Sequence, residues 1–399
     1  MNVLKASILA FCCVISADIF AQISTGDINN TNVPNSIRTA VPFMTIAPDA
    51  RSSAMADVGL ATSPDVNSQH WNPAKYAFIE QKGGISLSYS PWLRALVDDM
   101  NLLYLTGFWG IDRMQTVSAS LRYFDMGSIP FMDGNGQALL TGNPNEFAFD
   151  VGYSRKFSEK MSAAISFRYI RSDISSGVPA VAGTKAKAGN SFAGDIALYY
   201  RSDVELGSRK GTWALGANFS NLGTKMTYAN EQEKMFLPMN MGIGGSFGIL
   251  FDDYNKVTLA VDLNKLLVPT PPLRDITDNK NILKGKNDNV SVPKGIFQSF
   301  GDAPGGFSEE LHEVSLGAGL EYTYRNFFAV RTGYHHENRL KGNRRYFTMG
   351  VGVMLNVFEV DFSYLITPYS NRDPLANTLR FSLIFNLGAS GSTSSASGS

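Results

Sequence analysis

Apolar and polar residues alternate along most of this chain. Ile85, Leu87 and Tyr89 are separated by serines, and the same two-residue period returns in residues 117–123 and 147–153. Successive side chains of a strand point to opposite faces, so this period predicts half-buried β-strands. Further alternating segments cover residues 100–109, 161–173, 191–201, 212–222, 238–250, 256–267, 313–323, 327–336, 345–355, 358–366 and 378–387. The total of about fourteen, an even number, predicts an all-β fold, a transmembrane antiparallel β-barrel.

The lengths of the connections support a barrel. Links after even-numbered strands are short, as in 110–114 and 251–255, whereas links after odd-numbered strands, such as 126–145 and 268–311, are mostly long. Outer-membrane barrels alternate short periplasmic turns with long outer loops in this way, and a soluble sandwich has no reason to do so. The link 202–210 is longer than its class predicts.

The two faces of the strands differ in polarity. One face carries Leu, Val, Phe, Tyr and Ile, as lipid contact requires, and the other carries Gly, Ser and Ala with scattered charges. An Arg or Lys on the lipid side costs about 2–4 kcal/mol at the bilayer midplane, so we expect the charges to face the lumen. The expected lumenal charges are Arg122, Asp150, Arg168, Asp195, Asp262, Glu313, Glu321, Arg331, Glu359, Asp361 and Arg380.

Residues 43–78 precede every alternating segment and do not read as a strand. They are rich in small residues and are interrupted by Pro48, Pro64 and Pro73. Fourteen strands enclose a lumen wider than side chains alone can fill. We therefore expect this segment to be a plug, or hatch, inside the barrel. Its charges that are expected to pair with the wall are Arg51, Asp57 and Lys75.

The chain begins with the pattern of a secretory signal peptide, in which Lys5 precedes an apolar core. A lipoprotein leader ending at Cys12 is the alternative, which the bulky Phe11 disfavours. The predicted domains are a signal peptide (1–21), a periplasmic N-terminus with the hatch (22–80), the barrel (81–388) and a flexible, linker-like tail (389–399).

Composition narrows the class of protein. Charged residues make up only 18% and aromatic residues 12%, which suits strands with aromatic girdles better than a helical enzyme. The net charge of zero gives no basic excess for nucleic acid. The only cysteines, Cys12 and Cys13, lie in the predicted leader, so we expect neither disulfides nor thiol chemistry. Beyond the leader, no apolar run approaches the roughly 20 residues of a spanning helix.

Residues that often carry chemistry fit a barrel wall better than an active site. Residues 244–248 match G-x-S-x-G, but they lie within a predicted strand, not at the strand-to-helix turn that a nucleophile elbow needs. His335 and His336 would point to opposite faces of a strand and so would not bind one metal. Glu359 and Asp361 are expected to be balancing charges of the wall. We predict no enzymatic activity, no metal and no cofactor.

Two outer segments, 90–97 and the loop 268–311, are apolar where solvent would favour polar residues, and a predicted hairpin in 129–140 rises beyond the membrane. Exposed apolar clusters usually mark interaction surfaces, and loops of this length are generally functional or disordered. Anchoring to lipid, or packing over the barrel mouth, is the alternative. The candidate contact residues are Trp92, Leu93, Leu96, Phe131, Met132, Leu139, Leu140, Val268, Pro269, Pro271, Leu273, Ile296, Phe297 and Phe300.

Several of these stretches resemble a known family. Ala50-Arg51-Ser52-Ser53-Ala54-Met55-Ala56-Asp57 and His70-Trp71-Asn72-Pro73-Ala74 are similar to the N-terminal signature of FadL-like outer-membrane barrels. Together with Pro91-Trp92-Leu93 and Leu267-Val268-Pro269-Thr270-Pro271-Pro272, they resemble the PorV (LptO) family of the type IX secretion system. The resemblance extends over essentially the whole chain after the leader.

That resemblance implies a non-enzymatic protein of the bacterial outer membrane. Such proteins receive cargo carrying a C-terminal sorting domain as it leaves the type IX translocon. They then pass it to an attachment complex with a sortase-like peptidase, at a surface of outer-membrane lipid and LPS. The alternatives are a FadL-like transporter of hydrophobic small molecules and a barrel hydrolase acting on lipid. The former needs an apolar lumenal pocket and a lateral opening, and the latter a Ser/His/acid constellation that the sequence does not show.

Overall fold

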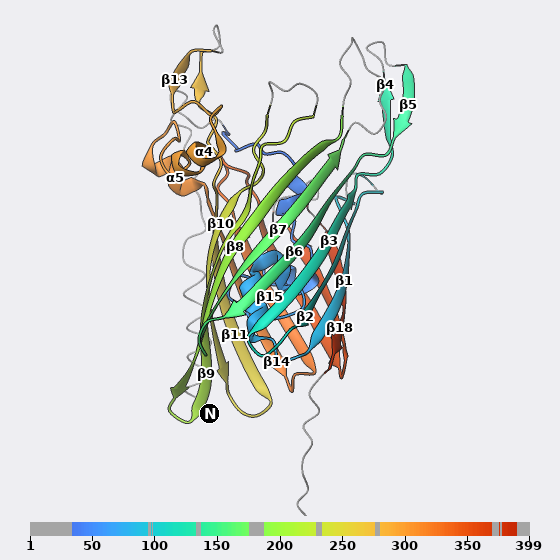
Figure 1. Cartoon of the computed structure of the whole chain (residues 1–399), viewed down its shortest axis with the longest axis vertical. Helices are drawn as coiled ribbons and strands as arrows, with labels where there is room; N and C mark the ends of the chain where they lie inside the picture. The colour runs from blue at the N-terminus through green and yellow to red at the C-terminus, as the bar shows by residue number, and fades with distance from the viewer. Residues whose placement is uncertain are drawn as a thin grey trace, which may run out of the picture. The chain divides into compact units, whose positions relative to one another are not determined.

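Fourteen strands close into one antiparallel barrel (Figure 1). The computed structural model describes residues 34–94, 97, 99–132, 137–174, 187–228, 234–275, 280–368, 375 and 377–388; the predicted leader, most of the 175–189 connection, Leu96 and the tail lie outside them. The wall strands are β1 (Gly83–Pro91), β2 (Asn101–Gly110), β3 (Gln115–Asp125), β6 (Asn145–Lys156), β7 (Met161–Asp173), β8 (Gly189–Leu206), β9 (Arg209–Gly223), β10 (Asn240–Leu250), β11 (Asn255–Leu266), β14 (Val314–Tyr324), β15 (Phe328–His336), β16 (Arg345–Leu355), β17 (Phe358–Ile366) and β18 (Leu379–Leu387). The predicted fold and strand number are confirmed.

The wall is closed where the first and last strands meet. Seven consecutive residue pairs join β1 to β18, from Gly83–Leu387 to Tyr89–Phe381. Among the described wall pairs, the register shifts only between β8 and β9, at Gly194/Ile196, and pairing continues on both sides of the shift. A continuous ladder satisfies the backbone groups that lipid cannot, which is why a barrel is stable in a bilayer.

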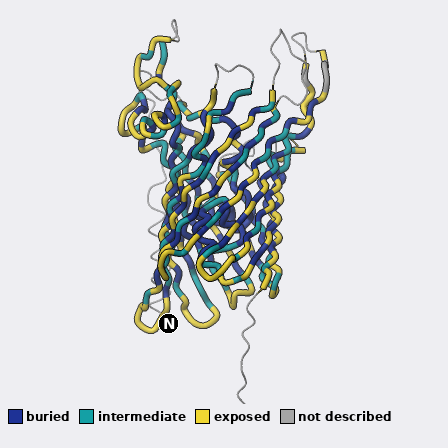
Figure 2. The backbone as a smooth tube through the Cα atoms, in the orientation of Figure 1, coloured by how far each residue is buried: buried dark blue, intermediate teal, exposed yellow. Residues whose placement is uncertain are grey.

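Exposure alternates along the strands, as Figure 2 shows for the backbone. On β1, Ile85 and Leu87 are 51% and 48% exposed, whereas Ser86 and Ser88 are 0% and 1% exposed. The outward side chains are large and apolar around the wall, including Phe149, Ile165, Leu198, Leu263 and Met349. This outward face is apolar enough to contact lipid, and the polar face lines the lumen.

The two ends of the barrel differ in their connections. One end has short turns, such as 111–114, 157–160 and 356–357, and the other has the long links. The link between β8 and β9 is a two-residue turn, 207–208, so the long link expected at 202–210 was wrong. Both strands extend beyond the wall, and the charged residues of that stretch belong to the extended ladder.

The long links carry further elements at the outer end (Figure 1). The predicted hairpin is present as β4 (Ile129–Met132) and β5 (Ala138–Gly142). The link from β11 to β14 contains β12 (Leu273–Arg274), β13 (Ile282–Lys284), α4 (Val292–Gln298) and α5 (Phe307–His312). Of the helices in the described part of the chain, none is long and apolar enough to cross a membrane.

The hatch occupies the lumen, as predicted, and contains only short helices: η1 (Pro42–Thr45), α2 (Ala50–Ala54), α3 (Ser68–Trp71) and η2 (Pro73–Phe78). The described chain enters the lumen at the outer mouth, where the Asn35 amide donates to Leu340 O at 2.8 Å. It leaves the lumen at the end with the short turns, where Ser162 Oγ donates to Ala74 O at 2.6 Å. From Pro34 onward the described chain thus lies at the outer mouth before it enters the lumen, and the predicted domain boundaries stay a prediction.

Candidate functional site

A buried charge cluster joins the hatch to the wall. Arg51 of the hatch donates through Nε and Nη2 to both carboxylate oxygens of Glu321, each at 3.0 Å. Glu321 also accepts from Arg331 Nε at 2.7 Å, and Arg331 Nη1 lies 2.5 Å from Asp361. Arg51 reaches a second carboxylate, Asp65, at 2.7 Å. Removing one partner of such a network leaves an uncompensated buried charge, so the cluster specifies where the hatch sits.

Other wall charges bind the hatch backbone. Arg122 Nη1 donates to Met44 O at 3.0 Å, and Arg380 Nε donates to Ala47 O at 3.1 Å. Asp262 Oδ2 accepts from the amides of Gly59 and Leu60 at 2.7 and 2.9 Å. An irregular segment cannot satisfy its own backbone groups when it is buried. The wall supplies the missing donors and acceptors, and these charges account for the position of a segment with little regular structure.

Further charged residues that were predicted to pair in the lumen do so, and Lys75 is an exception. Arg168 lies between Asp150 and Asp195 and donates to both. Asp57 accepts from the Tyr346 hydroxyl of the wall. The expectation for Lys75 was wrong: its Nζ donates within the hatch, to Gly59 O at 2.8 Å and Thr62 at 3.1 Å. The segment folds back on itself there, so the ammonium meets hatch carbonyls before it meets the wall.

Glycines of the wall make room for the hatch. A Cβ on Gly319 would lie 2.6 Å from Met55 Cβ, and one on Gly333 would lie 2.5 Å from the Met55 carbonyl carbon. At the same place Ala56 and Asp57 have φ angles of 62° and 63°, in the left-handed region that side chains disfavour. The hatch therefore makes a tight turn directly against the wall, at positions where any residue larger than glycine would collide with it.

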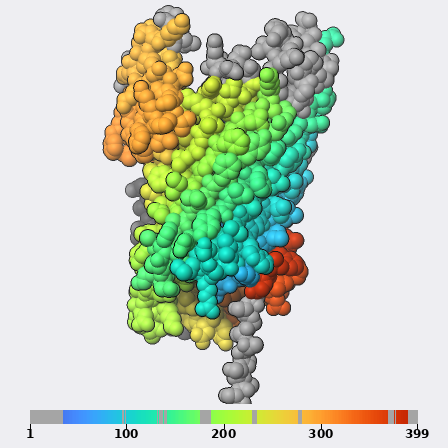
Figure 3. Space-filling model, in the orientation of Figure 1, coloured from blue at the N-terminus to red at the C-terminus, as the bar shows by residue number. Residues whose placement is uncertain are grey.

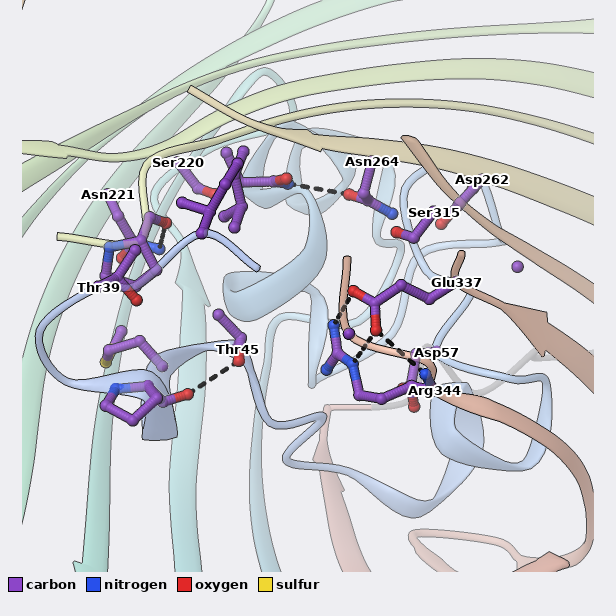
Figure 4. Close-up of a pocket in the computed structure, with 18 of the residues that line it drawn as sticks. Thr39, Thr45, Asp57, Ser220, Asn221, Asp262, Asn264, Ser315, Glu337 and Arg344 are labelled. Carbon is purple, nitrogen blue, oxygen red and sulfur yellow. Dashed lines mark hydrogen bonds and ion pairs between the residues drawn. The ribbon is translucent and has the colours of Figure 1, made fainter. Parts of the chain in front are cut away.

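Two cavities lie on opposite sides of the hatch. The outer cavity, of about 370 Å³, contains Asp57, Trp71 and Asp262 in its lining (Figure 4). The inner cavity, of about 220 Å³, is lined by residues that include Arg51 and Glu321. The two linings have no residue in common. The hatch and its charge cluster thus separate an outward-facing space from one that faces the short turns.

An apolar cluster closes the outer mouth around the chain that enters it. Phe43 and Met44 pack there with Leu267 and Val268, and Trp92 packs against the same cluster. The sequence predicts that the 90–97 segment and the 268–311 loop expose their apolar residues to solvent. That expectation is wrong for Val268 and Pro269, which are buried, and for Trp92, which is partly buried with the Arg380 guanidinium 5.6 Å from its ring. These residues pack over the barrel mouth, the alternative that the sequence left open.

The connection 267–313, here called the outer loop unit, is tied to the barrel by lysines. Lys265 Nζ lies 3.0 Å from Glu310 and 2.6 Å from Glu313. Lys341 lies 2.5 Å from Glu309 and 2.9 Å from Glu313. Burial raises the pKa of Glu309, but the hydrogen bond and charge of Lys341, together with hydrogen bonds from Gly305 and Asn35, outweigh it and hold the pKa below its usual range. The unit is therefore held in place by its acidic helix, α5.

The outer loop unit nevertheless exposes aromatic side chains. Phe297 is 79% exposed and Phe300 is 50% exposed, as predicted, and Phe307 and Leu311 are 77% and 57% exposed. Phe307 and Leu311 are not among the residues predicted above, although an apolar pair four residues apart in a short acidic segment is a signal that marks them. Figure 3 shows the unit in orange as a projection at the outer end of the barrel.

The other candidate contact residues vary in position. Met132 and Leu273 are 60% and 38% exposed. Leu93, Pro271 and Ile296 are partly buried. The side chains of Phe131, Leu139 and Leu140, in the β4–β5 hairpin, and the whole of Leu96 lie outside the described residues.

The residues weighed for chemistry lie in the wall. Residues 244–248 belong to β10, within a regular ladder. His335 stacks on Tyr346, with ring centroids 4.8 Å apart, whereas His336 lies on the opposite face near Tyr334. Among the described residues, no group of three His, Cys, Asp or Glu side chains is placed to hold a metal ion.

Several solved structures are similar to this one. The toluene transporter TodX of Pseudomonas putida matches with a TM-score of 0.46 at 11% identity, over 88% of this chain and 98% of that one. The toluene transporter TbuX of Ralstonia pickettii gives 0.44 at 11%, over 85% and 98%. A Pseudomonas aeruginosa FadL homologue gives 0.41 at 9%, over 89% and 100%. At this level of similarity nothing follows about ligands.

Sequence families give a more specific result. No curated protein sequence matches the chain significantly. Residues 29–273 match the family described as type IX secretion system protein PorV, and this range includes the hatch, the first nine wall strands and the start of the outer loop unit. The match covers more than half of the chain, so this outer-membrane barrel with a hatch in its lumen belongs to the PorV family of the type IX secretion system.

Proposed function

We propose that this protein is a non-enzymatic shuttle of type IX secretion that binds exported proteins on its outer surface. In this role it receives cargo through the C-terminal sorting domain as the cargo leaves the translocon. It then delivers the cargo to the attachment complex with its sortase-like peptidase. The observation that carries the proposal is a hatched barrel whose anchored outer loop unit presents exposed aromatic residues.

The shape of the lumen supports this role. The hatch is bound to the wall through Glu321, Asp262, Arg122 and Arg380, and it lies between the two cavities. A folded cargo domain would have no path through such a barrel. Any contact with cargo is then at the rim, where long connections are the available surface.

The outer loop unit is suited to protein contact. Aromatic residues dominate the energetics of protein interfaces, and rigid elements lose less entropy on binding than free loops do. Phe297, Phe300 and Phe307 combine high exposure with a base fixed by Lys265 and Lys341. We therefore assign the main docking surface to the two helices and the turn between them.

Point substitutions test this assignment without removing the loop, whose buried part closes the mouth. The combined variant Phe297→Ser, Phe300→Ser and Phe307→Ser should reach the outer membrane at normal levels and lose most surface display of cargo. The matched control, Phe157→Ser, changes a 59% exposed phenylalanine in a turn at the opposite end and should leave display intact. Normal display by the triple variant would refute the docking assignment.

The transporter alternative finds less support. It needs a lateral opening, but the described wall pairs from strand to strand all the way round. It also needs an apolar lumenal pocket, whereas the lumenal cavities are lined by Asp57, Asp262, Arg51 and Glu321 among others. Uptake of a hydrophobic nutrient that depended on this protein, with normal secretion in its absence, would favour the alternative.

A further inference from the structure

The outer cavity plays no part in the proposed docking, and its charges are not balanced. Its lining includes three Lys and Arg side chains, and each is already paired: Arg344 Nε lies 2.9 Å from Glu337, Lys341 lies 2.9 Å from Glu313, and Arg168 Nη2 lies 2.9 Å from Asp195. Two carboxylates of the lining, Asp57 and Asp262, have no cation within 4 Å among the described residues. Lys75 acts on Asp262 and Arg344 acts on Asp57 only from beyond that distance, so the cavity still favours a cation in direct contact with the two carboxylates.

The same lining contains hydrogen-bond acceptors with no partner. Oδ1 of Asp262 and Oδ1 of Asn218 are unpaired, on side chains of residues only 1% and 3% exposed. Asp57 Oδ1 is unpaired as well. The other polar atoms of these groups are used: Asp262 Oδ2 holds two hatch amides, and Asn218 Nδ2 donates to Trp71 O at 2.9 Å. His335, in the same lining, also has both ring nitrogens unpaired, and a neutral imidazole has one donor and one acceptor nitrogen. Unpaired acceptors therefore still outnumber unpaired donors around the cavity, and because buried polar groups are normally satisfied, this indicates a missing donor.

Shape and access suit a small organic group. The volume of about 370 Å³ falls at the lower end of the range for ligand sites. Pro42 and Thr45, both in the lining, lie at the outer mouth, and Thr45 is exposed, so solvent reaches the cavity. Trp71 also lines it, and an aromatic face attracts an ammonium group. Figure 4 shows Asp262, Asn264 and Ser315 on one side of the cavity and Asp57 with the Glu337–Arg344 pair on another.

We propose that this cavity binds a primary ammonium group carried on an extended chain. Asp57 and Asp262 supply the charge, Asn218 supplies an acceptor, and Trp71 adds an aromatic side chain to the lining. An organic cation is favoured over a metal ion because the described residues contain no group of three or more His, Cys, Asp or Glu side chains placed to hold a metal. The ammonium group has two possible sources: the lysine side chain of a peptide, or a free polyamine. The inference does not depend on cargo docking at the outer loop unit.

Titration calorimetry on the full-length barrel in detergent tests the site. The probes are cadaverine, a short peptide with one lysine, and the same peptide with that lysine acetylated. Cadaverine or the lysine peptide should bind, binding should weaken with added salt, and the acetylated peptide should not bind. The variants Asp57→Asn and Asp262→Asn keep an oxygen for Tyr346 and for the hatch amides, and each should weaken binding at least tenfold. The control Asp253→Asn alters an exposed turn at the opposite end and should have no effect.

The outcomes separate the two sources and the two proposals. Binding of cadaverine alone supports the site with a free amine as ligand, and tighter binding of the lysine peptide supports it with a peptide. Failure of both probes, or equal binding by the folded Asp57→Asn and Asp262→Asn variants, would overturn the inference. Melting curves of each variant identify unfolding. Loss of cargo display in the phenylalanine variants would be unaffected by either result.

Discussion

The buried contact between Arg51 and Glu321 should decide whether the hatch stays in the lumen. Replacement Glu321→Ala removes the acceptor of two hydrogen bonds from Arg51, each of 3.0 Å, and of one from Arg331, of 2.7 Å. The backbone pairing of β14 is untouched, because it does not involve the side chain. The variant therefore perturbs the attachment of the hatch and leaves the wall intact.

The size of the effect follows from the pairing that remains. Breaking a buried ion pair by removing one partner costs about 3–5 kcal/mol. Arg51 keeps Asp65 at 2.7 Å and Arg331 keeps Asp361 at 2.5 Å, so we use the lower end of that range. A loss of about 3 kcal/mol raises the population of the displaced hatch roughly 100-fold, since about 1.4 kcal/mol corresponds to a factor of ten.

A single cysteine introduced into the hatch reports that population. Ser53 is 1% exposed and its hydroxyl has no hydrogen-bond partner, so Ser53→Cys should be tolerated. The sequence has no cysteine after Cys13, which leaves the introduced side chain as the one thiol of the predicted mature chain. Its rate of modification by a charged thiol reagent tracks local opening when opening is fast relative to labelling. The rate should rise about 100-fold when Glu321→Ala is added and stay unchanged with Glu205→Ala, which removes an exposed acid of the β8 extension. An unaltered rate in a folded Glu321→Ala barrel would show that this cluster does not hold the hatch.

Three further changes test other parts of the structure. Gly319→Val places a side chain where a Cβ alone meets Met55 Cβ at 2.6 Å, so the thiol of the Ser53→Cys probe should also become more reactive while the heat-induced gel shift of the folded barrel is retained. Phe149→Arg puts a charge on a 47% exposed outward position of the wall and should cost about 2–4 kcal/mol, lowering the yield of folded barrel; equal yield would place this face away from lipid. Burial raises the pKa of Glu337, but the charge and hydrogen bonds of Arg344, with a contribution from His335, together outweigh it and lower that pKa from 4.5. The contact therefore stabilises the 337–344 loop above about pH 4.5 and is lost as the pH falls through the lowered value. Limited proteolysis of that loop should accelerate in acid for the wild type and show a much flatter pH dependence in Glu337→Gln.

Much of the fold could be predicted from local pattern. The two-residue period of Ile85, Leu87 and Tyr89 reports a strand with one face in lipid, whatever its neighbours are. Charged residues at alternate positions, such as Asp150 and Arg168, were predicted to face the lumen because a charge on the other face would lie in lipid at a high cost in free energy. Proline and small residues in 43–78 excluded a strand, and the size of the barrel left the lumen as its destination. These inferences need only the energetics of single side chains and of the backbone in a bilayer.

The candidate site depended on contacts between distant parts of the chain. Whether Val268 and Trp92 face solvent or the entering chain is decided by where residues 43–44 lie, and no local pattern contains that information. The partner of Lys75 proved to be the hatch itself, because the fold of a segment with little regular structure follows from the surface that surrounds it. Phe307 and Leu311 stay exposed because Lys265 and Lys341 bind the acidic residues beside them.

The sequence by itself determined the barrel, its orientation of faces and the presence of a plug, since each follows from residue periodicity and the cost of charge in lipid. Only the tertiary structure decided which apolar loops are buried and which are presented, and which carboxylates remain unpaired. Those outcomes depend on side chains far apart in sequence that meet only when the wall closes around the hatch.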